Sequence, residues 1–142
     1  MLCESVERPP EGRQWHYELK LDGFRAIGGK FGRGIELRSR NDKDFLRRFP
    51  SVVSALLELP TDTVIDGEIV ALDQEGKPGF NLLLGFGGKA AGIVLYAFDL
   101  LKFRNKDVRS WPLEERRGSL LEIVGQLPPS IRYSERFDGA PG

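Results

Sequence analysis

The sequence has one cysteine and one histidine in 142 residues, and these scarcities exclude whole classes of site. Cys3 has no partner for an internal disulfide, and His16 alone cannot supply a zinc site built on several histidines. No apolar run approaches the roughly 20 residues of a membrane-spanning helix, and the N-terminus lacks the basic head and apolar stretch of a signal peptide. We therefore expect no membrane association and a reducing, cytoplasmic setting.

An excess of either charge is also missing, because 21 Lys and Arg residues balance 21 Asp and Glu residues. Whole-chain electrostatics therefore do not indicate a nucleic-acid partner. The basic residues still gather in two runs, either of which could meet phosphates, although a solvated face is the commoner role of such charges. The two runs are Arg33, Arg38, Arg40, Lys43, Arg47 and Arg48, and then Lys102, Arg104, Lys106 and Arg109.

Hydrophobic periodicity predicts an α+β fold made of antiparallel sheets with inserted helices. Alternating apolar residues mark the strands, and apolar residues three and four positions apart mark the helices. A tight glycine turn at 32–34 is expected to join two of the strands. The predicted strands are 15–22, 24–31, 35–40, 64–72, 93–101 and 130–134, and the predicted helices are 49–57 and 112–124.

The segment Lys20-Leu21-Asp22-Gly23-Phe24-Arg25 contains the sharpest candidate for chemistry. A lysine is a nucleophile only when neutral; burial and nearby cations favour that form, whereas a nearby carboxylate opposes it. A bound magnesium-nucleotide would add positive charge. Gly23 would allow a tight turn, and Arg25 could hold a phosphate or ribose oxygen. From charge alternation alone, however, a solvent-facing strand that ends in a turn is the stronger interpretation.

Asp66-Gly67-Glu68 places two carboxylates on one side of an otherwise apolar strand. Together they could hold a hard cation such as magnesium or accept a hydrogen bond from a ribose hydroxyl. The alternative is an exposed strand edge that carries charges, and the pattern favours neither.

Tyr96-Ala97-Phe98-Asp99-Leu100-Leu101 is a nearly apolar run with one acidic residue. An unpaired charge is costly in a buried strand, so Asp99 is expected to have a partner. Phe98 could present its ring to a purine, although a place in the core is the commoner fate of such an aromatic.

Taken in order, these segments resemble the covalent nucleotidyltransferases, and among them the ATP-dependent DNA ligases. Lys20–Arg25 is similar to the family's first motif, Lys-x-Asp-Gly-x-Arg, and Ser39-Arg40-Asn41 to its next element. Asp66–Glu68 is similar to the third motif and Tyr96–Leu101 to motif IIIa. The resemblance covers nearly the whole chain and is strongest to the ligase modules of bacterial end-joining ligases. It implies a nucleotidyltransferase (ATP-grasp-like) adenylation domain.

The resemblance also implies a reaction. Lys20 would attack the α-phosphate of ATP, expel pyrophosphate and become a lysyl-AMP phosphoramide. In complete ligases the AMP then passes to the 5′-phosphate of nicked double-stranded DNA, and the 3′-hydroxyl seals the nick.

Five further residues receive roles from the same resemblance. Arg25 and Arg40 would contact the sugar or phosphates of the nucleotide. Glu68 would hold the ribose or the water of a metal, Mg²⁺ or Mn²⁺. Phe98 would pack on the adenine, and Glu18 would lie near its exocyclic edge.

The family's fourth motif, Glu-Gly-[Val/Ile]-x-x-Lys, its fifth motif and its oligonucleotide-binding domain are not found in this sequence. We expect residues 1–142 to be the N-terminal part of the adenylation domain, with the other parts beyond residue 142. The isolated chain is predicted to seal no nicks. Alternative hypotheses are an RNA ligase or capping guanylyltransferase, which share the Lys-x-Asp-Gly motif, and a non-catalytic remnant that binds nucleotide or nicked DNA.

Overall fold

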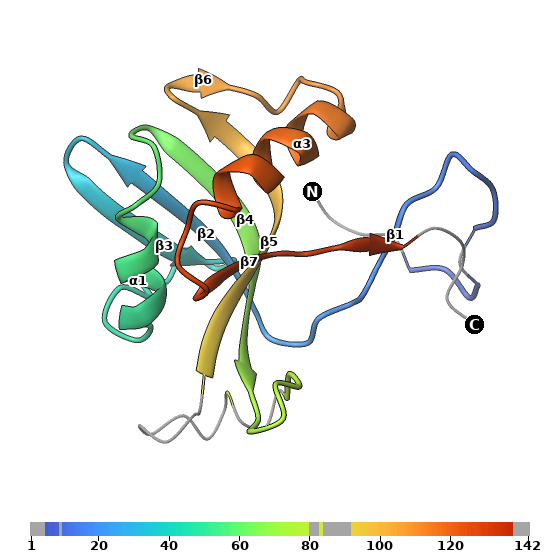
Figure 1. Cartoon of the computed structure of the whole chain (residues 1–142), viewed down its shortest axis with the longest axis horizontal. Coiled ribbons are helices and arrows are strands. Elements are labelled where there is room, and N and C mark those ends of the chain that lie inside the picture. The colour runs from blue at the N-terminus through green and yellow to red at the C-terminus, as the bar shows by residue number, and fades with distance from the viewer. Residues whose placement is uncertain (1–4, 9, 80–82, 84–91, 138–142) are drawn as a thin grey trace.

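The computed structural model describes residues 5–8, 10–79, 83 and 92–137, and it confirms the α+β class (Figure 1). Two helices are described, α1 (Pro50–Leu56) and α3 (Leu113–Val124). The strands are β1 (Tyr17–Glu18), β2 (Phe24–Phe31), β3 (Gly34–Ser39), β4 (Thr63–Leu72), β5 (Gly92–Phe103), β6 (Lys106–Asp107), β7 (Ile131–Tyr133) and β8 (Arg136–Phe137).

The main sheet has the strand order β3-β2-β4-β5-β6, and β7 lies beside β5. Among the described strands, every pairing is antiparallel, as predicted, except that of β5 with β7. Two parallel neighbours need a crossover connection, and α3 provides it by carrying the chain back to the start of β5.

Both helices pack on one face of the main sheet and enclose the hydrophobic core with it (Figure 1). Pro50 opens α1 in the first turn, where its missing N–H is not needed. The core residues of the helices are Val52, Ala55, Leu56, Leu120, Ile123 and Val124. Neither described helix has the length and apolar content needed to span a bilayer.

The two faces of β4 differ because its side chains alternate. Ile65 and Ile69 join the core beneath the helices, whereas Val70 and Leu72 belong to a smaller cluster with Val94. Asp66 and Glu68 share the face of that smaller cluster by the same alternation, which the sequence predicted. This second face has no helix on it among the described elements, so it is open to a ligand.

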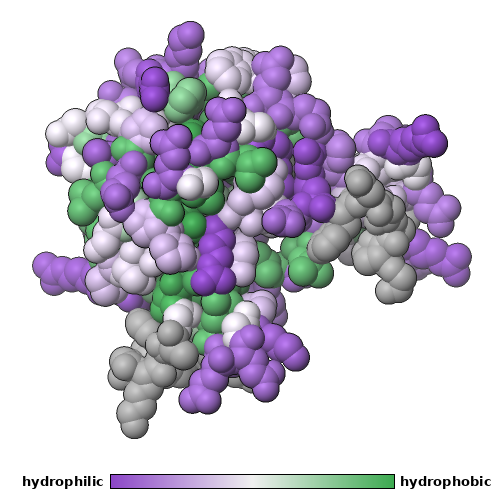
Figure 2. Space-filling view, in the orientation of Figure 1, coloured by the Kyte–Doolittle hydropathy of each residue, from purple (hydrophilic) through white to green (hydrophobic). Residues whose placement is uncertain are grey.

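The strand predicted for residues 15–22 is wrong, because only Tyr17–Glu18 forms a strand there and it pairs with β8 rather than with the main sheet. Trp15 and Leu19 were expected on a buried face with Tyr17, but they are 49% and 66% exposed. Residues 19–22 have no strand beside them among the described elements, so their alternation does not produce a half-buried strand. Figures 1 and 2 show β1 and β8 as an arm standing out from the main body.

Candidate active site

An open pocket of about 600 Å³ lies on the helix-free face of the sheet, and all six predicted site residues line it. They come from the arm, the segment before β2, the start of β2, the loop after β3, β4 and β5. The six residues are Glu18, Lys20, Arg25, Arg40, Glu68 and Phe98.

Lys20 lies in the irregular segment that connects β1 with β2. Leu21 packs on the smaller apolar cluster, and the N–H of Gly23 donates to Oε1 of Glu68 at 3.2 Å. A Cβ on Gly23 would lie 2.1 Å from the carbonyl oxygen of Ile69, so any other residue would push this segment away from β4. The exposed side chain of Lys20 lines the pocket and has no ion-pair partner among the described residues.

Glu68 is the carboxylate on the floor of the pocket. Burial raises its pKa above the ordinary 4.5, and the negative charges of Asp22 and Asp66 add to this. The Gly23 N–H and the charge of Arg25 act in the opposite direction without cancelling the rise. A carboxylate held in this way is less strongly solvated than one in water and is a better partner for a ligand hydroxyl or cation.

Asp66 forms an ion pair with Arg25. The Arg25 guanidinium donates from Nε and Nη2 to the two carboxylate oxygens of Asp66 at 2.8 and 2.6 Å, and Asp66 is only 5% exposed. The guanidinium carbon also lies 4.8 Å from the centre of the Phe98 ring. Within the described residues, no group of three or more acidic, histidine or cysteine side chains could hold a metal unaided.

Phe98 lies at a β-bulge of β5, on the face that it shares with Val94 and Tyr96 by alternation along the strand. Asp66 pairs with Asp99 and Gly67 pairs with Ala97, so Phe98 is an extra residue on β5. The bulge changes the alternation after Phe98, so that Leu100 faces the core, and such bulges are common beside active sites. Phe98 is partly exposed and lines the pocket, so it is not the buried core residue that the sequence also allowed.

Asp99 has a partner, as predicted, because Nε of Arg116 donates to its Oδ1 at 2.9 Å. The next residue along α3, Arg117, was missed. It is 1% exposed, and its Nη1 lies 2.8 Å from Oε1 of Glu18. A signal was available, because Arg117 shares the spacing of the core residues Leu120 and Val124 on the buried side of α3.

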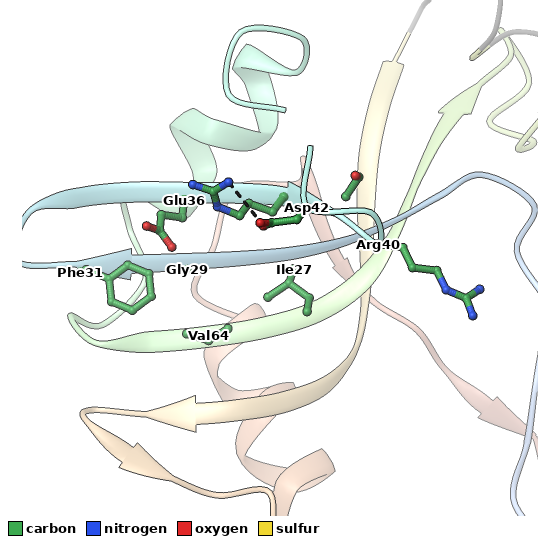
Figure 3. Close-up of a pocket in the computed structure, with 9 residues that line it drawn as sticks. Ile27, Gly29, Phe31, Glu36, Arg40, Asp42 and Val64 are labelled. Atoms are coloured by element: carbon green, nitrogen blue, oxygen red, sulfur yellow. Dashed lines mark hydrogen bonds and ion pairs between the residues drawn. The ribbon is translucent and has the colours of Figure 1, made fainter. Parts of the chain in front are cut away.

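Arg40 also borders a second, smaller hollow of about 250 Å³ on the same face (Figure 3). Its lining includes Ile27 and Phe31, and the nearby cations Arg33 and Arg38 are paired with acidic side chains. Figure 3 shows the side chain of Arg40 pointing away from this hollow. Arg40 has no ion-pair partner among the described residues, so the larger pocket offers a phosphate two unpaired cations.

The four motifs singled out in the sequence therefore meet around one pocket that contains a lysine amine, an aromatic ring and two arginines. A profile of the family described as ATP dependent DNA ligase domain matches residues 1–140. The chain belongs to the ATP-dependent DNA ligase family. The predicted resemblance is thereby confirmed.

Two solved ligase structures share the fold. The ligase domain of LigD from M. tuberculosis matches with a TM-score of 0.77 and 27% identity over 89% of this chain and 42% of that one. A mycobacterial DNA ligase D complexed with ATP and MES matches with a TM-score of 0.73 and 25% identity over 88% and 40%.

Among curated ligases, the multifunctional non-homologous end joining protein LigD of Pseudomonas aeruginosa is 37% identical over 137 residues. The match covers 94% of this chain but 16% of that protein. DNA ligase C of Mycobacterium tuberculosis is 37% identical over 87% of this chain and 37% of its own length. The chain thus spans well under half the length of both curated relatives.

The raised pKa of Glu68 predicts that Glu68→Gln stabilises the fold at neutral pH. The stability linked to this carboxyl is fully present below pH 4.5 and is lost as pH rises through the raised pKa. The melting temperature of the variant should therefore exceed that of the wild type at neutral pH, and the difference should vanish on acidification. Thermal unfolding followed by circular dichroism across this pH range would measure it.

Glu114→Gln is the matched control with the opposite sign. The hydrogen bond from Arg136 lowers the pKa of Glu114, so its contribution is present above pH 4.5 and is lost as pH falls. This variant should be less stable than the wild type at neutral pH. Equal destabilisation by both substitutions would show that burial of Glu68 is not the dominant influence.

Proposed function

We propose that the chain provides the nucleotide-binding part of an ATP-dependent DNA ligase, in which Lys20 is adenylylated. The observation that carries this proposal is that Lys20 lines one pocket with Glu18, Arg40, Glu68 and Phe98. The neutral amine attacks the α-phosphorus, an N–P bond forms, and the P–O bond to pyrophosphate breaks. The amine gives its proton to solvent, and the product is lysyl-AMP. Catalysis is mainly positioning and charge stabilisation around phosphorus.

The adenine is assigned to the end of the pocket formed by Glu18 and Phe98. A carboxylate accepts hydrogen bonds, which suits the exocyclic amine of adenine, and the Phe98 ring offers a face for stacking. Arg25 covers one side of this ring and is held there by Asp66. The Arg25 guanidinium lines the pocket from this position, and we assign it the contact with the sugar or phosphates.

The phosphates are assigned to Arg40 and to Lys20 itself, since neither has an ion-pair partner among the described residues. The site fits a divalent metal, Mg²⁺ or Mn²⁺, because such ions bind one or two carboxylates together with substrate phosphates. Glu68 would hold the ion, or its water, with the phosphates, and the ion would offset negative charge that develops on them. Glu68 is equally suited to accept from a ribose hydroxyl.

Nicked double-stranded DNA is the proposed acceptor of the AMP in the longer proteins that contain this segment. Residues 1–142 are proposed to be the N-terminal part of the adenylation domain in a cytoplasmic protein. We propose that these residues contribute to the adenylylation step, whereas sealing also needs groups that hold both DNA ends.

The test is incubation of the chain with Mg²⁺ and ATP or GTP radiolabelled at the α-phosphate, followed by a denaturing gel. We expect label from ATP that resists alkali and is released by mild acid, as a phosphoramide is. Label from GTP alone would assign the chain to the capping-type enzymes. Thermal stabilisation by ATP without label would indicate a remnant that binds nucleotide without chemistry. If ATP caused neither labelling nor stabilisation, the proposal would be overturned.

A further inference from the structure

Arg117 is a fully buried cation that the reaction described above does not use. Besides its ion pair with Glu18, it donates from Nη1 to the carbonyl oxygen of Phe98 at 2.7 Å and from Nη2 to that of Ser134 at 2.5 Å. Its guanidinium carbon lies 4.5 Å from the ring centre of Tyr133. Burying a charge is costly, and its Nε has no hydrogen-bond partner among the described residues. An apolar residue at this core position of α3 would avoid that cost.

The three groups that Arg117 holds belong to one corner of the pocket. Glu18, Phe98 and Ser134 all line it, although they come from β1, β5 and the residue after β7. Among the described strands, β1 pairs only with the two-residue strand β8, so the sheet itself does not fix Glu18. One guanidinium therefore joins the Glu18 carboxylate to the backbone of Phe98, and the base has been assigned to that carboxylate and the Phe98 ring.

We propose that Arg117 is a positioning residue that sets the purine preference of the pocket by holding Glu18 as an ionised acceptor beside Phe98. This inference rests on the proposed nucleotide site. Arg117 engages Oε1 of Glu18, which leaves Oε2 for the base. An ionised carboxylate only accepts hydrogen bonds, so it favours the exocyclic amine of adenine. A purine with a carbonyl at that position would bring two acceptors together.

The charges around Glu18 make this preference dependent on pH. Burial raises the pKa of Glu18, and Asp99 of β5 acts in the same direction. Arg117 is the strongest of the influences that lower it, followed by Arg136 of β8 and more weakly by His16. Loss of Arg117 should therefore allow Glu18 to be protonated at higher pH, and a protonated carboxyl can donate to a carbonyl.

The experiment compares the dissociation constants of ATP and inosine triphosphate for the chain by titration calorimetry with EDTA, which prevents adenylylation. Inosine triphosphate has a carbonyl in place of the adenine amine. We expect the wild type to prefer ATP by about tenfold or more, since a mismatched buried polar group is strongly rejected. In Arg117→Met the preference should fall to within about threefold, and Arg117→Lys should recover part of it. Acidification should reduce the preference at higher pH in Arg117→Met than in the wild type.

Arg116→Gln is the matched control, because it removes the neighbouring cation and leaves buried Asp99 unpaired without touching a pocket residue. It should destabilise the fold yet keep the preference for ATP. Glu18→Gln should abolish the preference for ATP, since an amide can donate or accept. If Arg117→Met does not fold, this variant and Arg117→Lys still test whether an ionised Glu18 sets the preference.

Two results would overturn the inference alone, both with ATP still bound. One is no preference for ATP in the wild type, and the other is an unchanged preference in Arg117→Met or Glu18→Gln. Failure of the wild type to bind ATP at all would instead overturn the proposed function.

Discussion

Replacement of Lys20 by arginine is expected to abolish covalent labelling by ATP and to leave ATP binding within a few-fold of the wild type. A guanidinium stays protonated at any usable pH, so it keeps the positive charge but has no lone pair for attack on phosphorus. Removing a nucleophile of this kind costs on the order of 10³-fold or more in rate. Gel labelling measures the covalent step, and calorimetry with EDTA measures binding separately.

Lys43→Arg is the appropriate control for this experiment. Lys43 is exposed in the loop after β3 and lines neither of the two pockets. Its variant should be labelled like the wild type. Full labelling of Lys20→Arg would mean that another side chain accepts the AMP, and the proposed mechanism would then be wrong.

Gly67→Ala is expected to cause a large loss of stability. Gly67 is buried in β4 between β2 and β5, and a Cβ there would lie 2.4 Å from the carbonyl oxygen of Tyr96. Backbone cannot yield as a flexible side chain does, so the two strands would have to separate. We expect a cost of about 3 kcal/mol or more, which lowers the melting temperature of a chain of this size by about 10 °C.

Two other glycines provide controls for the loss of backbone freedom. A Cβ on Gly32, in the turn between β2 and β3, or on Gly118, in α3, would meet nothing within 4 Å. Gly32→Ala should change stability little, and Gly118→Ala should increase it by up to about 1 kcal/mol because alanine favours helix. If Gly67→Ala had the same melting temperature as Gly32→Ala, the close approach of β4 and β5 would not be what requires glycine at position 67.

The long elements could be predicted from the sequence because each has a hydrophobic pattern of its own. The strands expected at 24–31, 64–72 and 93–101 correspond to β2, β4 and β5, and the predicted helices to α1 and α3. These elements bury one face or both, so tertiary structure supports what the local pattern already favours.

The segment that carries Lys20 could not be predicted in the same way. Residues 15–22 alternate as regularly as a true strand does, yet a strand needs a neighbour for its backbone hydrogen bonds. Residues 19–22 have no such neighbour in the part of the chain that the structure describes, and the N–H of Gly23 donates to the Glu68 carboxylate instead. Information about which segments lie side by side is absent from local periodicity.

The surroundings of Phe98 show the same limit. The bulge at Phe98 is a mismatch between β4 and β5, so it is a property of the pairing of two strands and not of either sequence alone. The link from Arg117 to Glu18 joins α3 to an arm almost a hundred residues earlier in the chain. Only the apolar spacing of α3 gave any indication that this arginine is buried.

The pairing of β1 with β8 fixes the order in which the pocket can be completed during synthesis. Tyr17 lies opposite Phe137 and Glu18 opposite Arg136, so the arm closes only when both ends of the described chain are available. A nascent chain that has emerged through β5 already contains Lys20, Glu68 and the ring of Phe98, but it lacks α3 and β8. Among the parts of the pocket that the described residues form, the corner assigned to the base is therefore completed after Lys20, Glu68 and Phe98 have emerged from the ribosome.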